Sequence, residues 1–167
     1  MSILDVFTVP DSRLRQKAQP VECVDDAIRR FMDDMLETMY ASKGCGLAAT
    51  QVGIGKRIIV MDLKHQYPDS QPYKMVNPEI LWKSEELSPF DEGCLSVPEQ
   101  TAEVLRPSSV TVRYLDEWGQ AHEEKVDGFF ATCVQHEIDH LDGKLFIDYL
   151  SPIKRDMMIR RVKKIMR

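Results

Sequence analysis

Apolar side chains recur at the spacing of a helix face early in the chain. After Asp25 they fall at Ile28, Phe31, Met32, Met35, Leu36, Met39 and Tyr40. Intervals of three and four residues are those of one helical face. Asp25 is a suitable N-cap for this helix, and Gly44 is a suitable C-terminal stop. We interpret the methionine-rich stripe as core packing, because the flexible thioether fills irregular gaps.

A second helix is predicted over residues 128–142, with apolar side chains on more than one stripe. These side chains are Phe129, Phe130, Cys133, Val134 and Leu141. A helix that is apolar nearly all round is usually buried. A last helix is predicted to begin near Pro152 and to run to the terminus, because proline suits the first helical turn.

Short apolar and alternating runs predict strands over 57–63 and 74–82, and a hairpin of 110–115 with 121–126. Residues 89–98 are interpreted as a loop or a short strand, and residues 1–24 as irregular chain. Strands and helices are mixed without β-α-β alternation, which indicates an α+β fold. We expect antiparallel strands around the second helix, and a separate helix at the C-terminus.

Composition fits one globular domain, which we take to be a single catalytic domain over residues 1–167. The chain is 43% hydrophobic and 29% charged, with a net charge of −5, so it is not built to coat nucleic acid. We expect no signal peptide and no membrane span, because the N-terminus lacks a basic region and the apolar runs are short. Four cysteines without a Cys-x-x-Cys pair indicate a reducing, cytoplasmic compartment.

The run His136-Glu137-Ile138-Asp139-His140 carries the clearest chemical signal. On a helix, His136 and His140 lie on one face with Cβ atoms about 5–6 Å apart. Two imidazoles placed in this way can bind one metal ion, and Glu137 beside them can move protons. The alternative is a buried helix that merely contains polar rings. It is disfavoured because each unpaired buried polar group costs about 2–7 kcal/mol.

A catalytic metal site needs a third protein ligand and keeps one position open. The residues alone leave this ligand undecided among Cys94, Cys133, Cys45, Cys23, His65, His122 and several carboxylates. Cys94 is modestly favoured, because the preceding Gly93 allows the backbone to approach a ligand. By default we interpret Cys133 as a small core side chain, and His65 and His122 as solvated surface residues.

A third group of residues runs from Gly44 to Gln51 and is rich in glycine and alanine. Small residues there indicate that another group passes close to the backbone. A phosphate-binding loop is excluded, since the Lys-Ser/Thr ending and a preceding strand are missing. Gln51 could donate to a developing oxyanion, although a surface or capping role is the simpler interpretation from the sequence alone.

These three blocks, in this order, resemble the peptide deformylase family. The matching stretches are Gly44 to Gln51, Glu92 to Ser96, and Gln135 to His140. The likeness extends to residues 9–15, the first helix and residues 148–152, and so covers essentially the whole chain. Three blocks together are far more specific than one His-Glu-x-x-His run.

The resemblance implies a role for each matching residue. Cys94, His136 and His140 would bind the metal, and Glu137 would handle the protons. Gln51 and the backbone N–H of Leu95 would stabilise the oxyanion. Gly46 and Gly93 would align the substrate backbone like an added strand. The reaction implied is hydrolytic removal of formate from the N-formyl-methionine of newly synthesised proteins.

The resemblance further implies ferrous iron as the native ion, with zinc, nickel or cobalt as substitutes, whereas coordination rules alone would favour zinc. We expect Phe129 and Cys133 to line the pocket for the methionine side chain, and Cys45 to lie against the substrate. Thr101, where close relatives often carry arginine, Lys43 and Cys45 depart from the family pattern. These departures concern substrate preference and not the reaction.

The C-terminal segment is strongly basic. Residues 153–167 hold seven Lys or Arg and one Asp, a charge of +6, while the other 152 residues carry −11. This asymmetry usually means a solvated helix face. The resemblance implies instead a contact with the ribosome near the peptide exit, and no contact with DNA or membrane.

Two alternatives are weighed against a deformylase. Another zincin-like peptidase or amidase would need a His or Glu ligand downstream of His140, and the sequence there offers only Asp142, Asp148 and Asp156. A structural metal module, or a degenerate paralogue that binds formyl-peptides without cleaving them, would have no use for Glu137 and Gln51. Both alternatives are therefore less favoured.

Overall fold

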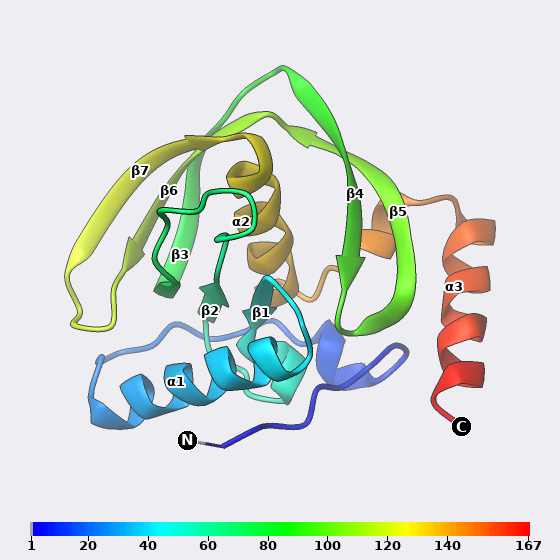
Figure 1. Ribbon diagram of the computed structural model, residues 1–167, viewed down its shortest axis with the longest axis horizontal. Helices are drawn as coiled ribbons and strands as arrows, with labels where there is room; N and C mark the ends of the chain where they lie inside the picture. The colour runs from blue at the N-terminus through cyan, green and yellow to red at the C-terminus, as the bar shows by residue number, and fades with distance from the viewer. Residues whose placement is uncertain (1) are drawn as a thin grey trace.

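The computed structural model describes residues 2–167 and has the expected α+β architecture (Figure 1). A five-stranded antiparallel sheet has the order β1-β2-β3-β6-β7, and β4 and β5 form a separate two-stranded sheet. The strands are β1 (Gly46–Ala48), β2 (Ile58–Met61), β3 (Tyr73–Lys83), β4 (Leu87–Cys94), β5 (Val97–Pro107), β6 (Ser109–Leu115) and β7 (Ala121–Asp127). The helices are α1 (Asp26–Ala41), α2 (Gly128–Leu141) and α3 (Pro152–Ile165), with short 3-10 turns at Ser12–Arg15, Ala49–Val52 and Phe146–Tyr149.

The short strand β2 separates two hydrophobic clusters. Ile59 and Met61 point into the cluster that contains the apolar side chains of α2. Ile58 and Val60 point the other way, into the cluster built on α1. Successive strand residues face opposite sides of a sheet. Because a hydrophobic cluster covers each side of β2, all four side chains are fully buried. The continuous apolar run at 58–61 therefore reflects a strand covered on both faces.

Helix α2 lies at the centre of the molecule (Figure 1). It contacts the strands of both sheets, with the five-stranded sheet on one side and the β4–β5 hairpin on the other. Ten of its residues are buried, including His136, Glu137 and His140. Gly143 ends the helix with a positive φ of 76°. The prediction of a buried second helix is confirmed, and its burial explains why it shows more than one apolar stripe.

Helix α1 begins and packs as its sequence predicts. The Asp25 carboxylate caps it by accepting a hydrogen bond from the N–H of Ile28 at 3.0 Å. Met32, Met35 and Met39 are fully buried. The predicted C-terminal stop is wrong in detail, because Lys43 and not Gly44 takes the left-handed conformation, with φ 59°. Gly44 lies close to Leu95, and a Cβ there would be 2.9 Å from Leu95 Cδ1, so that side chain would have to shift.

The main correction to the predicted fold concerns residues 89–98. They do not form a loop or a short strand but the closed end of a long hairpin, in which β4 pairs with β5 from Leu87↔Pro107 to Cys94↔Val97. The Pro, Asp and Gly residues of this segment masked the strand signal. Because β4 and β5 are paired only with each other, they tolerate proline better than central strands do.

Helix α3 lies on the outer side of β5 (Figure 1). It buries only Met158 and Val162, one helical turn apart, against a third cluster that includes Val97 and Phe146. The rest of its surface is mostly exposed and carries basic side chains together with exposed apolar ones such as Ile153 and Met157. Over residues 2–167, no helix combines the length and the apolar character needed to cross a membrane.

We predict that Met35→Ala lowers the free energy of unfolding by about 2–5 kcal/mol, because it opens a cavity in a fully buried cluster. Met157→Ala is the matched control, since Met157 is 42% exposed and should change stability by less than about 0.5 kcal/mol. Urea denaturation followed by circular dichroism measures both. Equal effects of the two substitutions would contradict the packing described for α1.

Candidate active site

Three potential metal ligands converge where the tip of the β4–β5 hairpin meets α2. The Nε2 atoms of His136 and His140 lie 3.3 Å apart, and Cys94 Sγ lies 3.3 Å from His140 Nε2. All three ligand atoms lie within 4.8 Å of one another, and both histidines are buried. The third potential ligand, Cys94, thus precedes the helix in the sequence. This agrees with the resemblance to deformylases, whereas the peptidase alternative needs a ligand that follows His140.

The spacing of these atoms fits a tetrahedral metal ion. Ion-to-ligand distances of about 2.0–2.1 Å to nitrogen and 2.3 Å to sulfur place neighbouring ligand atoms roughly 3.3–3.6 Å apart. Burial, and then the charge of His136, lower the pKa of His140 well below its ordinary value. Burial also opposes a proton on His136, but hydrogen bonds to Cys94 and Glu92 outweigh it and raise that pKa. A bound cation would satisfy both imidazoles without a shared proton.

A buried carboxylate fixes the orientation of His136. Glu92 Oε1 lies 2.8 Å from His136 Nδ1, which leaves Nε2 facing Cys94 and His140. The Arg106 guanidinium donates to both oxygens of Glu92, at 2.7 and 3.0 Å, and to Asp139 at 2.8 Å. Burial raises the pKa of Glu92, but His136 and Arg106 outweigh it and lower that pKa. Glu92 is therefore ionised and orients the histidine.

Sequence reasoning missed Arg106 and Glu92 as site residues. Glu92 stands in the block around Cys94, two residues away, so its position was a usable signal. Arg106 reaches the site only because β5 folds back along β4, and no local pattern marks it. Its other carboxylate partner, Asp139, also accepts a hydrogen bond from the hydroxyl of Tyr149 at 2.7 Å.

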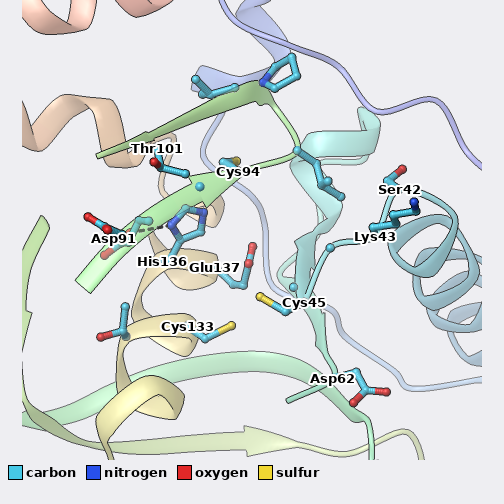
Figure 2. A pocket seen from close by; sticks show the side chains of 18 of the residues that line it. Ser42, Lys43, Cys45, Asp62, Asp91, Cys94, Thr101, Cys133, His136 and Glu137 are labelled. Atoms are coloured by element: carbon cyan, nitrogen blue, oxygen red, sulfur yellow. Dashed lines mark hydrogen bonds and ion pairs between the residues drawn. The ribbon is translucent and has the colours of Figure 1, made fainter. Parts of the chain in front are cut away.

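Glu137 lies beside the histidines with few partners of its own. It is 4% exposed, and Oε1 has no hydrogen-bond partner among the described residues. Burial raises its pKa to about 7. Gly46 of β1 passes so close that a Cβ there would lie 2.3 Å from Glu137 Oε2. Only glycine fits this position, and Figure 2 shows the carboxylate pointing into the cleft between α2 and β1.

Gln51 is buried and held at both ends of its amide. Its Oε1 accepts the N–H of Ala48 at 3.0 Å, and its Nε2 donates to Ser96 Oγ at 3.0 Å. The same Nε2 lies 3.4 Å from Cys94 Sγ. The capping role suggested by the sequence is therefore present, and the amide is also directed towards the cysteine. A surface role for Gln51 is excluded by its 1% exposure.

A cleft of about 1110 Å³ opens beside these residues. Most of the predicted site residues line it: Cys45, Gly46, Gln51, Gly93, Cys94, Leu95, Phe129, Cys133, His136 and Glu137. His140 lies beneath it with 1% exposure. Lys43 and Thr101, which depart from the family pattern, lie at the wall (Figure 2). The structure therefore brings all the predicted site residues together around one cleft.

The two remaining histidines lie outside the ligand cluster. His122 is exposed, bonds to Asp116 at 2.7 Å and stacks on the ring of Tyr114. His65 is exposed at the cleft wall. Neither belongs to the cluster of Cys94, His136 and His140. The interpretation of both as exposed surface residues is confirmed.

Comparison with known proteins identifies the family. The model of the polypeptide deformylase family matches residues 3–156. A peptide deformylase of Phenylobacterium zucineum is 56% identical over 98% of this chain and 97% of its own length. One of Rickettsia akari is 53% identical over 99% of this chain and 97% of its own length. The crystal structure of the Ehrlichia chaffeensis peptide deformylase in complex with actinonin superposes with a TM-score of 0.95 at 47% identity, covering 100% of this chain and 99% of that one. The chain therefore belongs to the polypeptide deformylase family.

Proposed function

We propose that this chain hydrolyses the formyl amide of N-formyl-methionine on newly synthesised proteins, and that Cys94, His136 and His140 hold the metal it needs. The observation that carries the proposal is the convergence of these three ligand atoms beside a buried Glu137, in a chain that matches peptide deformylases along its length. Residues 1–167 would act as one catalytic domain in the cytoplasm.

Three protein ligands would leave one position on the ion open for the reacting groups. A divalent ion held there supplies Lewis acidity, which makes hydroxide available near neutral pH and polarises a carbonyl. We propose ferrous iron as the native ion, on the strength of the family resemblance, with zinc, nickel or cobalt as substitutes. The thiolate of Cys94 supports a soft transition metal over magnesium or calcium.

Glu137 is proposed to accept the proton from the attacking water and to pass it to the leaving amine. Its pKa of about 7, raised by burial, suits both transfers near neutral pH. Gln51 Nε2 and the backbone N–H of Leu95 are proposed to stabilise negative charge on the formyl oxygen. Gln51 is already held in place by Ala48 and Ser96, so little reorganisation is needed.

The substrate is proposed to lie in the cleft as an extended chain. Gly46 and Gly93 lie on its opposite walls and have no side chain to block a strand that pairs with their backbones. Phe129 and Cys133 on α2 would contact the methionine side chain, with Cys45 facing them from the other wall. Phe129 also packs edge-on against Phe90 of β4, which fixes its ring.

The basic helix α3 is proposed to contact the ribosome. The exposed cations of this helix are Lys154, Arg160, Arg161, Lys163 and Lys164, and Arg167 follows its end. Since only Met158 and Val162 are buried, these side chains are available to ribosomal phosphates.

We predict that Glu137→Gln lowers formate release from a formyl-Met-Ala-Ser peptide by at least about 10²-fold, because the proton acceptor is lost. The amide should fit without disturbing the fold, as Glu137 Oε1 has no partner to lose. Metal analysis of anaerobically purified protein should find the metal retained, with iron the main ion. Glu123→Gln, at an exposed position, is the control and should retain full activity. Full activity of Glu137→Gln would refute the proposed role.

Glu92→Gln is predicted to weaken metal affinity by about 10–100-fold, because the buried charge that orients His136 is removed. Competition with a chromophoric chelator measures the affinity independently of turnover. The control is Glu103→Gln, an exposed position on β5. Unchanged affinity in Glu92→Gln would show that the Glu92 charge does not position the ligand.

For α3, the pair Arg160→Glu and Lys164→Glu should weaken ribosome binding and reduce the slope of log affinity against log salt by about 2, one for each lost phosphate contact. Turnover of a short formyl-peptide should be unchanged, since both side chains are exposed and far from the ligands in sequence. Lys17→Glu with Lys83→Glu makes the same charge change elsewhere and should leave binding intact. An unchanged salt slope for the α3 pair would argue against the contact.

A further inference from the structure

Two thiols that the proposed reaction does not use meet across the cleft. Cys45 directly precedes β1, and its carbonyl is held by the N–H of Asp62 at 2.9 Å. Cys133 lies on α2, one helical turn before Glu137. Because Gly46 touches Glu137, the chain at Cys45 is brought against this same face of α2. Both cysteines line the cleft, and Figure 2 shows their sulfur atoms facing each other across it.

The two cysteines differ in access to solvent. Cys45 is exposed, whereas Cys133 is only 6% exposed. The neighbouring Cys133 thiol lowers the pKa of Cys45 to about 7, and the Cys45 thiol, together with burial, raises the pKa of Cys133. Thiolate character and access are what make a thiol reactive. Cys45 is therefore suited to react first, with Cys133 placed directly behind it.

The other two cysteines are differently placed. Cys94 Sγ contacts His140 and Gln51 and belongs to the proposed ligand set. Cys23 is exposed, precedes α1 and does not line the cleft. Cys45 and Cys133 are thus a separate pair, with the arrangement of an attacking and a resolving thiol.

We propose that Cys45 and Cys133 are a site of reversible oxidation, at which peroxide converts the facing thiols to a disulfide across the cleft. A disulfide in a reducing compartment is usually transient and redox-sensing, which fits an exposed thiol at a cleft wall.

The chemistry balances with hydrogen peroxide as the oxidant. The Cys45 thiolate attacks one peroxide oxygen, the O–O bond breaks, and the hydroxide released takes a proton to become water. Cys45 is then a sulfenic acid. Cys133 loses its proton and attacks the Cys45 sulfur, and the S–O bond breaks with release of a second water. Two thiols are oxidised by two electrons, and one peroxide is reduced to two waters.

The disulfide would narrow the part of the cleft in which the methionine side chain is proposed to bind. This consequence rests on the proposed function. Formation of the bond itself does not depend on that function. The bond would join α2 to the segment before β1 and withdraw both sulfur atoms from contact with substrate. We expect it to raise KM for formyl-methionyl peptides by about 10-fold or more, the effect of a lost apolar contact in a specificity pocket.

Mass spectrometry tests the site directly, because each cysteine falls on its own tryptic peptide. Cys45 lies in residues 44–56, Cys133 in 126–144, Cys94 in 84–113 and Cys23 in 18–29. Nickel-loaded enzyme is treated with stoichiometric peroxide, blocked with N-ethylmaleimide and digested without reduction. The proposal predicts that 44–56 becomes linked to 126–144, and that a thiol reductant reverses the link. Recovery of both peptides as maleimide adducts, or linkage of either to 84–113 instead, would overturn it.

Variants separate this site from oxidation elsewhere. Cys23→Ser should form the same link and keep the activity of the parent enzyme, before oxidation and after reduction. Cys45→Ser and Cys133→Ser should each abolish the link. Each variant's KM after peroxide should match its own KM before it, while the parent's KM rises and recovers on reduction. If the link forms but the parent's KM does not change, the oxidation site is supported and the narrowing of the proposed methionine pocket is refuted. Failure of formate release in untreated enzyme would instead refute the proposed function.

Discussion

The arrangement of the site depends on one buried carboxylate. Glu92, on β4, accepts two hydrogen bonds from Arg106 and contacts His136 Nδ1, and Arg106 continues to Asp139. These contacts tie the β4–β5 hairpin to α2, although the two strands are not part of the main sheet. Removing one partner would leave an uncompensated charge in the interior, which typically costs about 3–5 kcal/mol. The same network that joins hairpin to helix thus fixes where Cys94 lies relative to the histidines.

The central position of α2 follows from this arrangement and explains its unusual composition. The helix must be apolar towards the five-stranded sheet, where Ala131, Val134 and Ile138 pack. It must also carry His136 and His140 towards the hairpin, and Glu137 towards Gly46 of β1. His136 is paired with Glu92 and His140 faces the ligand cluster, whereas Glu137 is buried without a partner for Oε1 among the described residues, and burial raises its pKa. Stability and chemistry are therefore built on two faces of one helix.

Local patterns predicted much of the fold and only part of the site. The stripe on α1, the buried helix α2 and the β6–β7 hairpin follow from periodicity and turn residues. The length of the β4–β5 hairpin could not be predicted in this way, because Pro89, Asp91 and Gly93 are poor strand formers and their pairing is long-range. The His136–His140 pair was evident from spacing, but Cys94 could not be selected by physics alone, and Arg106 gave no signal. Contacts between residues that are distant in the sequence, such as those made when β5 folds back along β4, cannot be predicted from patterns that span only a few residues.

X-ray absorption at the zinc edge of zinc-loaded protein tests the proposed ligand set of Cys94, His136 and His140. We predict one sulfur at about 2.3 Å and two imidazole nitrogens at about 2.0–2.1 Å, with the remaining position filled by a light atom. A first shell without sulfur would remove Cys94 from the site. A shell with two sulfurs would bring a second cysteine to the ion and close the position at which the proposed reaction takes place.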